Sequence, residues 1–235
     1  MATIKERQLA LGVLADEVAS CEKCPRLRNH CRSVAREKRA AYRDWDYWGR
    51  PVPGFGDVRA KVLVVGLAPA AHGANRTGRM FTGDRSGDFL YAALHRAGLA
   101  SQPTSTDRED GLVLYGAYIS AAARCAPPGN KPTPAELDRC LPYLERELEL
   151  LTDVGAFPTL GRIGHDALIA ALMRRKAIGT GARFPFAHGA VHVLPDPWPP
   201  IVCSYHVSQQ NTFTGRLTPR MFDEVIQTAL RLSRR

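Results

Sequence analysis

Long apolar runs, internal repeats and low-complexity tracts are absent from this sequence of 235 residues. No stretch approaches the roughly 18 to 20 consecutive apolar residues that cross a bilayer, which argues against a membrane partner. The segment from Met1 to Arg7 is polar, whereas a secretory signal needs an apolar stretch. We therefore expect a soluble cytoplasmic protein. Because 45% of the residues are hydrophobic, the chain can bury a substantial core within a single domain.

Acidic residues are scarce relative to basic ones. The chain has 23 Asp and Glu against 32 Lys and Arg, which gives a formal charge of +9 and a pI near 9.5. This balance favours a polyanionic partner, since phosphate neutralisation supplies most non-specific nucleic-acid affinity, although many basic proteins bind no nucleic acid. One segment concentrates the charge and is either a phosphate-binding surface or a solvated face. Its basic residues are Arg26, Arg28, Arg32, Arg36, Lys38, Arg39 and Arg43.

The six cysteines have no secretory context, so a disulfide framework is not their expected use. Cys21 and Cys24 have the C-x2-C spacing that lets two sulfurs reach one metal, and Cys125 and Cys140 form a second, wider pair. Together they indicate one four-sulfur site, for which zinc and an iron–sulfur cluster are equally compatible. A redox C-x-x-C and buried cysteines that act as small hydrophobes are the alternatives. The two remaining cysteines are Cys31 and Cys203. Cys203 lies in an apolar run, which predicts a residue of the core.

Strand and helix patterns alternate along the chain after residue 60. Residues 61–66 are a continuously apolar run, typical of a strand buried on both faces of a parallel sheet. Thr133, Pro134 and Glu136 form a capping box that starts a helix. The alternation predicts a three-layer α/β/α domain with a mostly parallel sheet, packed against an N-terminal extension up to about residue 58. The expected helices are 4–19, 86–97, from 133, 163–173 and from 218, and the expected strands are 61–66, 114–123, 157–160, 191–194 and 201–205.

The candidate functional residues lie in the loops that follow these strands, because ligands of such sheets bind beyond the carboxyl ends of the strands. The loop 66–87 lacks both common phosphate-binding fingerprints. Its glycines allow a ligand to approach the backbone, Phe81 offers a stacking surface, and Asp84 is either a functional carboxylate or a helix cap. Asn130 follows the second strand and could be a turn residue only.

The last strand leads to His206, which is followed by uncharged hydrogen-bonding side chains suited to phosphates and base edges. A lone histidine in such a place is either structural or catalytic. A second histidine pattern, His188-x3-His192, mimics a metal pair but is interpreted as loop and strand with little functional weight.

Three separated motifs and both cysteine pairs resemble those of the family 5, or type b, uracil-DNA glycosylases. The motifs are GLAPA with MFTGD (66–70 and 80–84), RCAPPGN (124–130) and HVSQQNTFTGRLT (206–218), in consistent order over about residues 20 to 230. The resemblance implies a four-stranded parallel sheet flanked by helices. It also implies a [4Fe-4S] cluster, held here by Cys21, Cys24, Cys125 and Cys140. The resemblance, and not the spacing, therefore favours iron–sulfur over zinc.

The implied activity is hydrolytic removal of uracil from DNA by a monofunctional base-excision-repair glycosylase acting as a monomer in the nucleoid. Such an enzyme must flip the nucleotide out of the duplex. His206 suits donation to the departing base, and Asp84 and Asn130 suit positioning of water beside the cationic sugar. The expected base-binding residues are Gly66, Leu67, Ala68, Phe81 and Ala121. The expected DNA-binding residues are Ser208, Gln209, Gln210, Asn211, Thr214 and Arg216, with Arg220 and the basic segment on phosphates.

Two positions depart from related glycosylase families, which place a polar residue where this chain has Leu67 and a uracil-reading Asn where it has Ala121. A site that does not form two hydrogen bonds with uracil discriminates less sharply between bases, because such selectivity arises when the wrong base leaves buried polar groups of the site unpaired. We therefore expect a broad range of substrates that includes hypoxanthine. A non-enzymatic iron–sulfur protein that binds nucleic acid, or an electron-transfer protein, would share the cysteines but would not need Asp84, Asn130 and His206 together.

Overall fold

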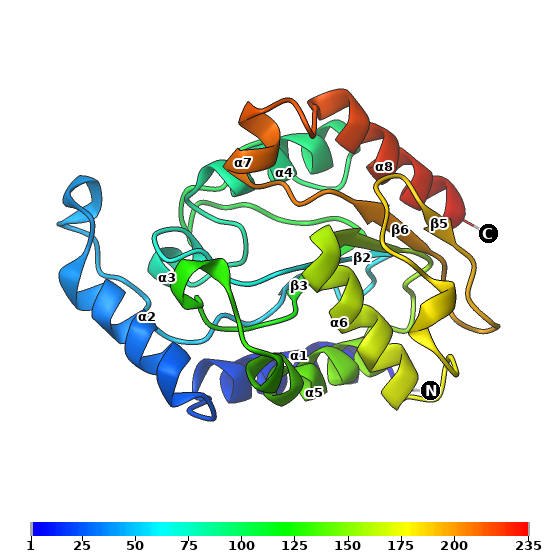
Figure 1. Ribbon diagram of the computed structural model, residues 1–235, viewed down its shortest axis with the longest axis horizontal. Coiled ribbons are helices and arrows are strands. Elements are labelled where there is room, and N and C mark those ends of the chain that lie inside the picture. The colour runs from blue at the N-terminus through cyan, green and yellow to red at the C-terminus, as the bar shows by residue number, and fades with distance from the viewer. Residues whose placement is uncertain (1, 235) are drawn as a thin grey trace.

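The computed structural model describes residues 2–234 and contains a sheet with the strand order β1-β3-β2-β4-β6-β5 (Figure 1). The four inner strands are parallel, which confirms the predicted four-stranded parallel sheet. Two short edge strands run antiparallel to their neighbours, and the first of them was not predicted. The strands are β1 (Phe55–Gly56), β2 (Val62–Gly66), β3 (Ala117–Ala121), β4 (Phe157–Leu160), β5 (Val191–His192) and β6 (Ile201–Ser204).

Helices cover both faces of the sheet. The capping box at Thr133 starts α5 as predicted, and Thr3 begins α1 in the same way. No helix within residues 2–234 combines the length and the apolar character that a bilayer crossing needs. The helices are α1 (Ile4–Ala19), α2 (Pro25–Glu37), α3 (Ala74–Thr77), α4 (Arg85–Arg96), α5 (Pro134–Leu150), α6 (Gly161–Arg174), α7 (Gln209–Phe213) and α8 (Pro219–Leu232), with 3-10 turns η1 (Ala40–Tyr42), η2 (Pro128–Asn130) and η3 (Gly181–Arg183).

The alternating side chains of β2 show why its sequence is apolar throughout. Val62 and Val64 pack into the core shared with α4 and α8, whereas Leu63 and Val65 pack into the core shared with α5 and α6. All four are at most 1% exposed. The sheet is therefore the middle of three layers, and every side chain of this strand is excluded from water.

The first helix docks on the same layer as α5. Arg7 of α1 is buried, and its guanidinium donates to Thr152 Oγ1 at 2.7 Å and to Asp153 Oδ2 at 2.8 Å just beyond α5. The next helix, α2, lies at the end of the molecule opposite the two chain termini (Figure 1). The loops that follow β2, β3 and β6 contain α3, η2 and α7, and they build the candidate site at the carboxyl edge of the sheet.

Candidate active site

A cavity of about 350 Å³ opens at the carboxyl ends of the parallel strands. Its size lies within the range of small-molecule sites. The structure brings three residues predicted to be catalytic, Asp84, Asn130 and His206, to this one cavity from three different loops. The full lining is Leu67, Ala68, Ala70, Phe81, Asp84, Ser86, Asn130, His206, Ser208, Gln210 and Asn211.

The remaining predicted contact residues lie outside that lining. Gly66 and Ala121 are register partners at the ends of β2 and β3, and both are buried. Arg216 lines a neighbouring groove together with His206 and Asn211, and its guanidinium lies 4.5 Å from the centre of the Tyr205 ring. Gln209 and Thr214 are exposed on the loop around α7.

Asp84 both caps a helix and lines the cavity. Its Oδ1 accepts a hydrogen bond from the Gly87 amide at 3.0 Å, at the N-terminus of α4. Burial raises the pKa of Asp84, while the backbone amides of Gly87 and Ser86 oppose that rise by stabilising the charged form. The helix-cap interpretation and the functional one are therefore compatible, because the capping geometry fixes the carboxylate at the cavity wall.

His206 is half-buried and lies two residues beyond the end of β6. Burial lowers its pKa to about 4, so the imidazole is neutral near pH 7 and has one N–H donor and one acceptor nitrogen. The backbone carbonyl of the same residue accepts a hydrogen bond from Asn211 Nδ2 at 2.8 Å. This bond ties the start of the loop to α7 and holds the histidine in place.

Two cavity residues have left-handed backbone conformations. Phe81 has φ = 53° and Asn130 has φ = 58°. Residues other than glycine seldom adopt such angles, and backbone strain of this kind is found at many functional sites. The Phe81 ring rests on Gly66, where a Cβ would lie 2.7 Å from the ring atom Cζ. Its centre is 6.2 Å from that of the His206 ring. Glycine at position 66 thus lets an aromatic surface lie directly over the strand end.

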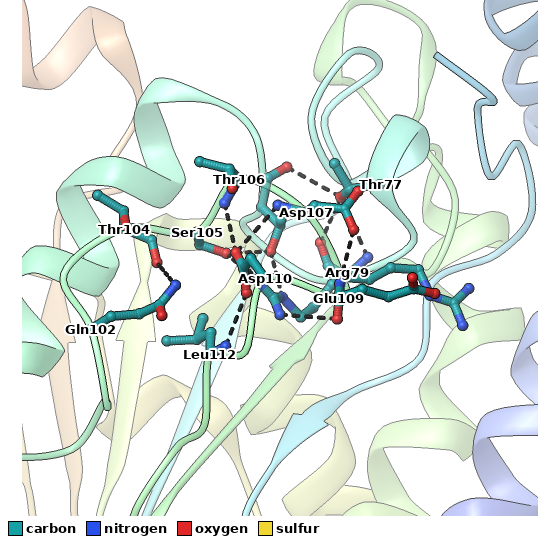
Figure 2. A network of polar contacts seen from close by, with 12 residues as sticks. Thr77, Arg79, Gln102, Thr104, Ser105, Thr106, Asp107, Glu109, Asp110 and Leu112 are labelled. Carbon is teal, nitrogen blue, oxygen red and sulfur yellow. Dashed lines mark hydrogen bonds and ion pairs between the residues drawn. The ribbon is translucent and has the colours of Figure 1, made fainter.

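A buried polar network behind the cavity supports this loop, and the sequence patterns did not reveal it. Figure 2 shows Arg79 and Asp110 at its centre, joined by an ion pair of 2.7 Å. Arg79 also donates to Thr82 Oγ1 at 2.9 Å and to Ser105 Oγ at 2.8 Å. Arg79 and Thr82 flank Phe81, so the network fixes the strained residue from both sides.

The four paired cysteines lie where α2, α5 and the end of β3 meet. Cys24 caps α2, Cys140 lies on α5, and the charge of the Cys140 thiol interacts with those of Cys21, Cys24 and Cys125. Cys31 is also buried here. Its thiol contacts that of Cys125 and donates to the Ala126 carbonyl at 3.7 Å, a position that its spacing in the sequence did not predict.

The chemistry of the four paired cysteines suits a metal group bound by sulfur alone. All four are free thiols, of which Cys24, Cys125 and Cys140 are buried and Cys21 is half-buried. Thiolates bind both zinc and iron–sulfur clusters, so these residues fit the cluster that the resemblance implies.

Part of the basic segment is engaged within the protein. Arg26 donates to Glu136 at 2.7 Å, which lowers the pKa of that carboxylate to about 2. Arg28 is buried and donates to the Gly49 carbonyl at 3.1 Å. The basic residues at the end of α2 and beyond it, Arg36, Arg39 and Arg43, are exposed.

Comparison with known proteins agrees with this architecture. Residues 53–230 match the model of the uracil DNA glycosylase superfamily. The chain is 53% identical to the type-5 uracil-DNA glycosylase of Thermus thermophilus over 92% of its own length and 95% of that protein, and 51% identical to that of Mycobacterium bovis over 92% and 79%. A type-4 uracil-DNA glycosylase of Pyrobaculum aerophilum is 30% identical over 70% and 67%. The chain belongs to the uracil-DNA glycosylase superfamily, in its type-5 family.

Proposed function

We propose that the protein is a monofunctional glycosylase of base-excision repair that removes uracil from DNA by hydrolysis. The convergence of Asp84, Asn130, His206 and Phe81 on one cavity carries this proposal. These are an acid, an amide, a neutral imidazole and a stacking surface, which is the set that cleavage of an N-glycosidic bond requires. The type-5 relatives bear the same activity in their names.

The base enters the cavity after the nucleotide has been flipped out of the helix, a step that costs a few kcal/mol and least at a mispaired or damaged base. Phe81 stacks on the flipped base. Negative charge develops on the base as the bond from the sugar C1′ breaks, and the N–H of neutral His206 donates to a base oxygen that carries this charge. Backbone amides near Gly66 and Leu67 assist in holding the base.

The sugar becomes cationic in the same step. The Asp84 carboxylate stabilises this charge, and together with the Asn130 amide it orients a water molecule whose oxygen bonds to C1′. The proton released by the water passes to Asp84. The base leaves with the electron pair of the broken bond and then takes up a proton from solvent, so the products are the free base and an abasic site.

A broad substrate range follows from the apolar character of the cavity wall. Leu67 lines the cavity, and Ala121 is buried in the same core cluster as Phe81 without a polar group. Neither side chain demands the hydrogen-bonding edge of uracil, so discrimination against hypoxanthine and other deaminated bases is weak.

The loop around α7 contacts the DNA. Ser208, Gln210 and Asn211 line the cavity mouth, and Gln209, Thr214 and Arg216 extend the contact to the neighbouring groove and backbone. At the end of α7, Phe213 is 73% exposed. A large aromatic side chain in that position fills the gap that the flipped base leaves in the stack.

Cys21, Cys24, Cys125 and Cys140 hold a [4Fe-4S] cluster in this proposal. The cluster supplies structural cross-linking, because hydrolysis of a glycosidic bond transfers no electrons. It would join α2 and the loop after β3, which carries Asn130, to α5. We also propose that the segment up to about residue 58 is part of one domain, and that the protein acts as a monomer on DNA in the cytoplasm.

A panel of duplexes, each with one uracil, hypoxanthine or undamaged base, tests the proposal. Purified protein without added metal should create alkali-labile sites at uracil and hypoxanthine. Asp84→Asn, Asn130→Ala and His206→Ala should each lower the single-turnover rate by at least about 100-fold. Background cleavage for every base would overturn the glycosylase proposal and favour a nucleic-acid-binding protein without enzymatic activity.

A further inference from the structure

Three side chains that can bind a metal lie together near the edge of the sheet. They do not line the cavity, and they are not among the four paired cysteines. They are His165 of α6, His192 of β5 and Cys203 of β6, and one ligand atom from each lies within 4.8 Å of the other two. Cys203 Sγ is 3.4 Å from His165 Nδ1. His165 is 1% exposed and Cys203 is fully buried, whereas His192 is partly exposed at the sheet edge.

Each of the two imidazoles has one ring nitrogen beside a backbone carbonyl. His165 Nε2 lies 2.7 Å from the Phe184 carbonyl, and His192 Nε2 lies 3.0 Å from the Pro185 carbonyl. Because a carbonyl only accepts, each neutral ring carries its hydrogen on Nε2 and keeps a lone pair on Nδ1. A backbone carbonyl that fixes the tautomer in this way is the usual outer partner of a metal-bound histidine.

A second polar group lies beside the trio. Thr159 of β4 is the register neighbour of Cys203, so their side chains lie on the same face of the sheet. The Thr159 hydroxyl is buried and interacts with the side chain of Cys203. A deprotonated Cys203 would accept a hydrogen bond from it, which is what a metal-bound thiolate offers.

We infer that His165, His192 and Cys203 form a zinc site. Two imidazoles and one thiolate without a carboxylate suit Zn²⁺ and exclude the oxygen-seeking Mg²⁺ and Ca²⁺. Tetrahedral bonds of about 2.05 Å to nitrogen and 2.3 Å to sulfur place those two atoms about 3.5 Å apart, close to the 3.4 Å between His165 Nδ1 and Cys203 Sγ. Water completes the fourth position.

The site would join three elements near the base-binding cavity. It links α6 and β5 to β6, the strand that leads to His206 two residues beyond its end. The neighbouring His188 takes no part, since its ring stacks on Tyr205 and its Nδ1 accepts from the Tyr205 amide. His188 is therefore the matched control histidine.

Zinc binding to the iron-loaded protein tests the inference, because an occupied four-cysteine site cannot take up zinc. The protein is prepared anaerobically, incubated with Zn²⁺ and desalted, and its iron and zinc are counted by mass spectrometry. We expect about one zinc per chain in the wild type and in His188→Gln. His192→Gln and Cys203→Ala should each lower the zinc affinity by at least about 10-fold, because loss of even a group that only hydrogen-bonds a ligand has an effect of that size. The iron content should not change.

A second readout covers the case in which the buried Cys203→Ala variant folds poorly. His192→Gln changes a partly exposed residue at the sheet edge, and zinc should raise the melting temperature of the wild type but not of this variant. X-ray absorption at the zinc edge should show one sulfur and two imidazole neighbours. Zinc that binds equally well to His192→Gln, or no zinc retained by the wild type, would leave only a thiol–imidazole hydrogen bond and overturn the inference.

Discussion

The Oδ2 atom of Asp84 occupies the space that a side chain on Gly73 would fill. An ideal Cβ at residue 73 would overlap this oxygen and crowd the rest of the carboxylate. The backbone of Gly73 has φ = −99° and ψ = −106°, a combination outside the regions that residues with a side chain usually adopt, so glycine is needed here for backbone freedom as well as for room. The loop that starts α3 and the cap of α4 thus determine together where the carboxylate points.

The variant Gly73→Ala should therefore lose activity while the protein stays folded. The added methyl displaces the Asp84 carboxylate, and a misplacement of about 1 Å at a reacting centre can lower a rate about 100-fold. Single-turnover excision of uracil measures the effect. Gly12→Ala is the control, because Gly12 lies inside α1 with nothing near its Cβ position and should gain about 0.5–1 kcal/mol of stability without a change in rate. Equal rates for both variants would contradict the proposed role of the carboxylate.

Burial shifts the pKa values of the two titrating groups of the cavity in opposite directions. Burial lowers the pKa of His206 to about 4, so its ring should titrate near that value in NMR spectra, and not near 6.5. Burial raises the pKa of Asp84, so the excision rate should fall on the acid side as Asp84 is protonated. Asp84→Asn should be slow at every pH and lack this acid limb. An imidazole titration near 6.5 would remove the neutral His206 from the mechanism.

The same histidine has a consequence for stability. The folded protein binds a proton at His206 more weakly than the unfolded chain does, since the folded pKa is lower. Its stabilising contribution is therefore fully present above pH 6.5 and is lost as the pH falls from there towards about 4. The free energy of unfolding of His206→Gln, measured across that range by denaturant titration, should vary less with pH than that of the wild type.

Elements with local signals could be predicted from the sequence, and contacts between distant segments could not. The apolar run of β2 and the capping box of α5 reveal themselves within a few residues. The pairing of Arg79 with Asp110 joins residues 31 positions apart, and no periodic pattern announces it. The contact of Cys31 with Cys125 is hidden for the same reason. Asp84, Asn130 and His206 could be predicted to lie together because the loops that carry them follow parallel strands, and the carboxyl ends of such strands share one edge of the sheet.

The replacement Ala121→Asn should narrow the range of bases. Ala121 is 2% exposed on the face of β3 that packs with Phe81, so an amide there can meet the hydrogen-bonding edge of uracil. The ratio of hypoxanthine to uracil excision rates should fall at least about 10-fold. Ala122→Asn places the same amide in the opposite core at similar burial and controls for the loss of stability. An unchanged ratio in Ala121→Asn would count against the explanation of broad specificity.

Removal of one proposed cluster ligand should separate the cysteines by role. Cys140→Ala should lose its iron and its broad visible absorption, and it should melt at a lower temperature, because metal binding and folding are coupled. A loss of 2 kcal/mol corresponds to about 4–8 °C for a domain of this size. Cys31→Ala should keep the full iron content, although this thiol touches Cys125. Iron loss from Cys31→Ala with iron kept in Cys140→Ala would reassign the ligand set.

The last prediction concerns Arg216, the basic side chain at the groove beside the cavity. Its guanidinium lies over the Tyr205 ring and is exposed, so it is free to contact a phosphate. Arg216→Ala should weaken binding to damaged and undamaged duplexes alike and should reduce the slope of log affinity against log salt by about 0.9. Fluorescence anisotropy in an Asp84→Asn background, which slows turnover, measures both quantities.

Arg96→Ala is the control, because Arg96 is paired with Asp223 at 2.7 Å on the outer face of α4 and α8. An equal change in the salt slope for both variants would place the DNA contact elsewhere, since Arg96 lines neither the cavity nor its neighbouring groove.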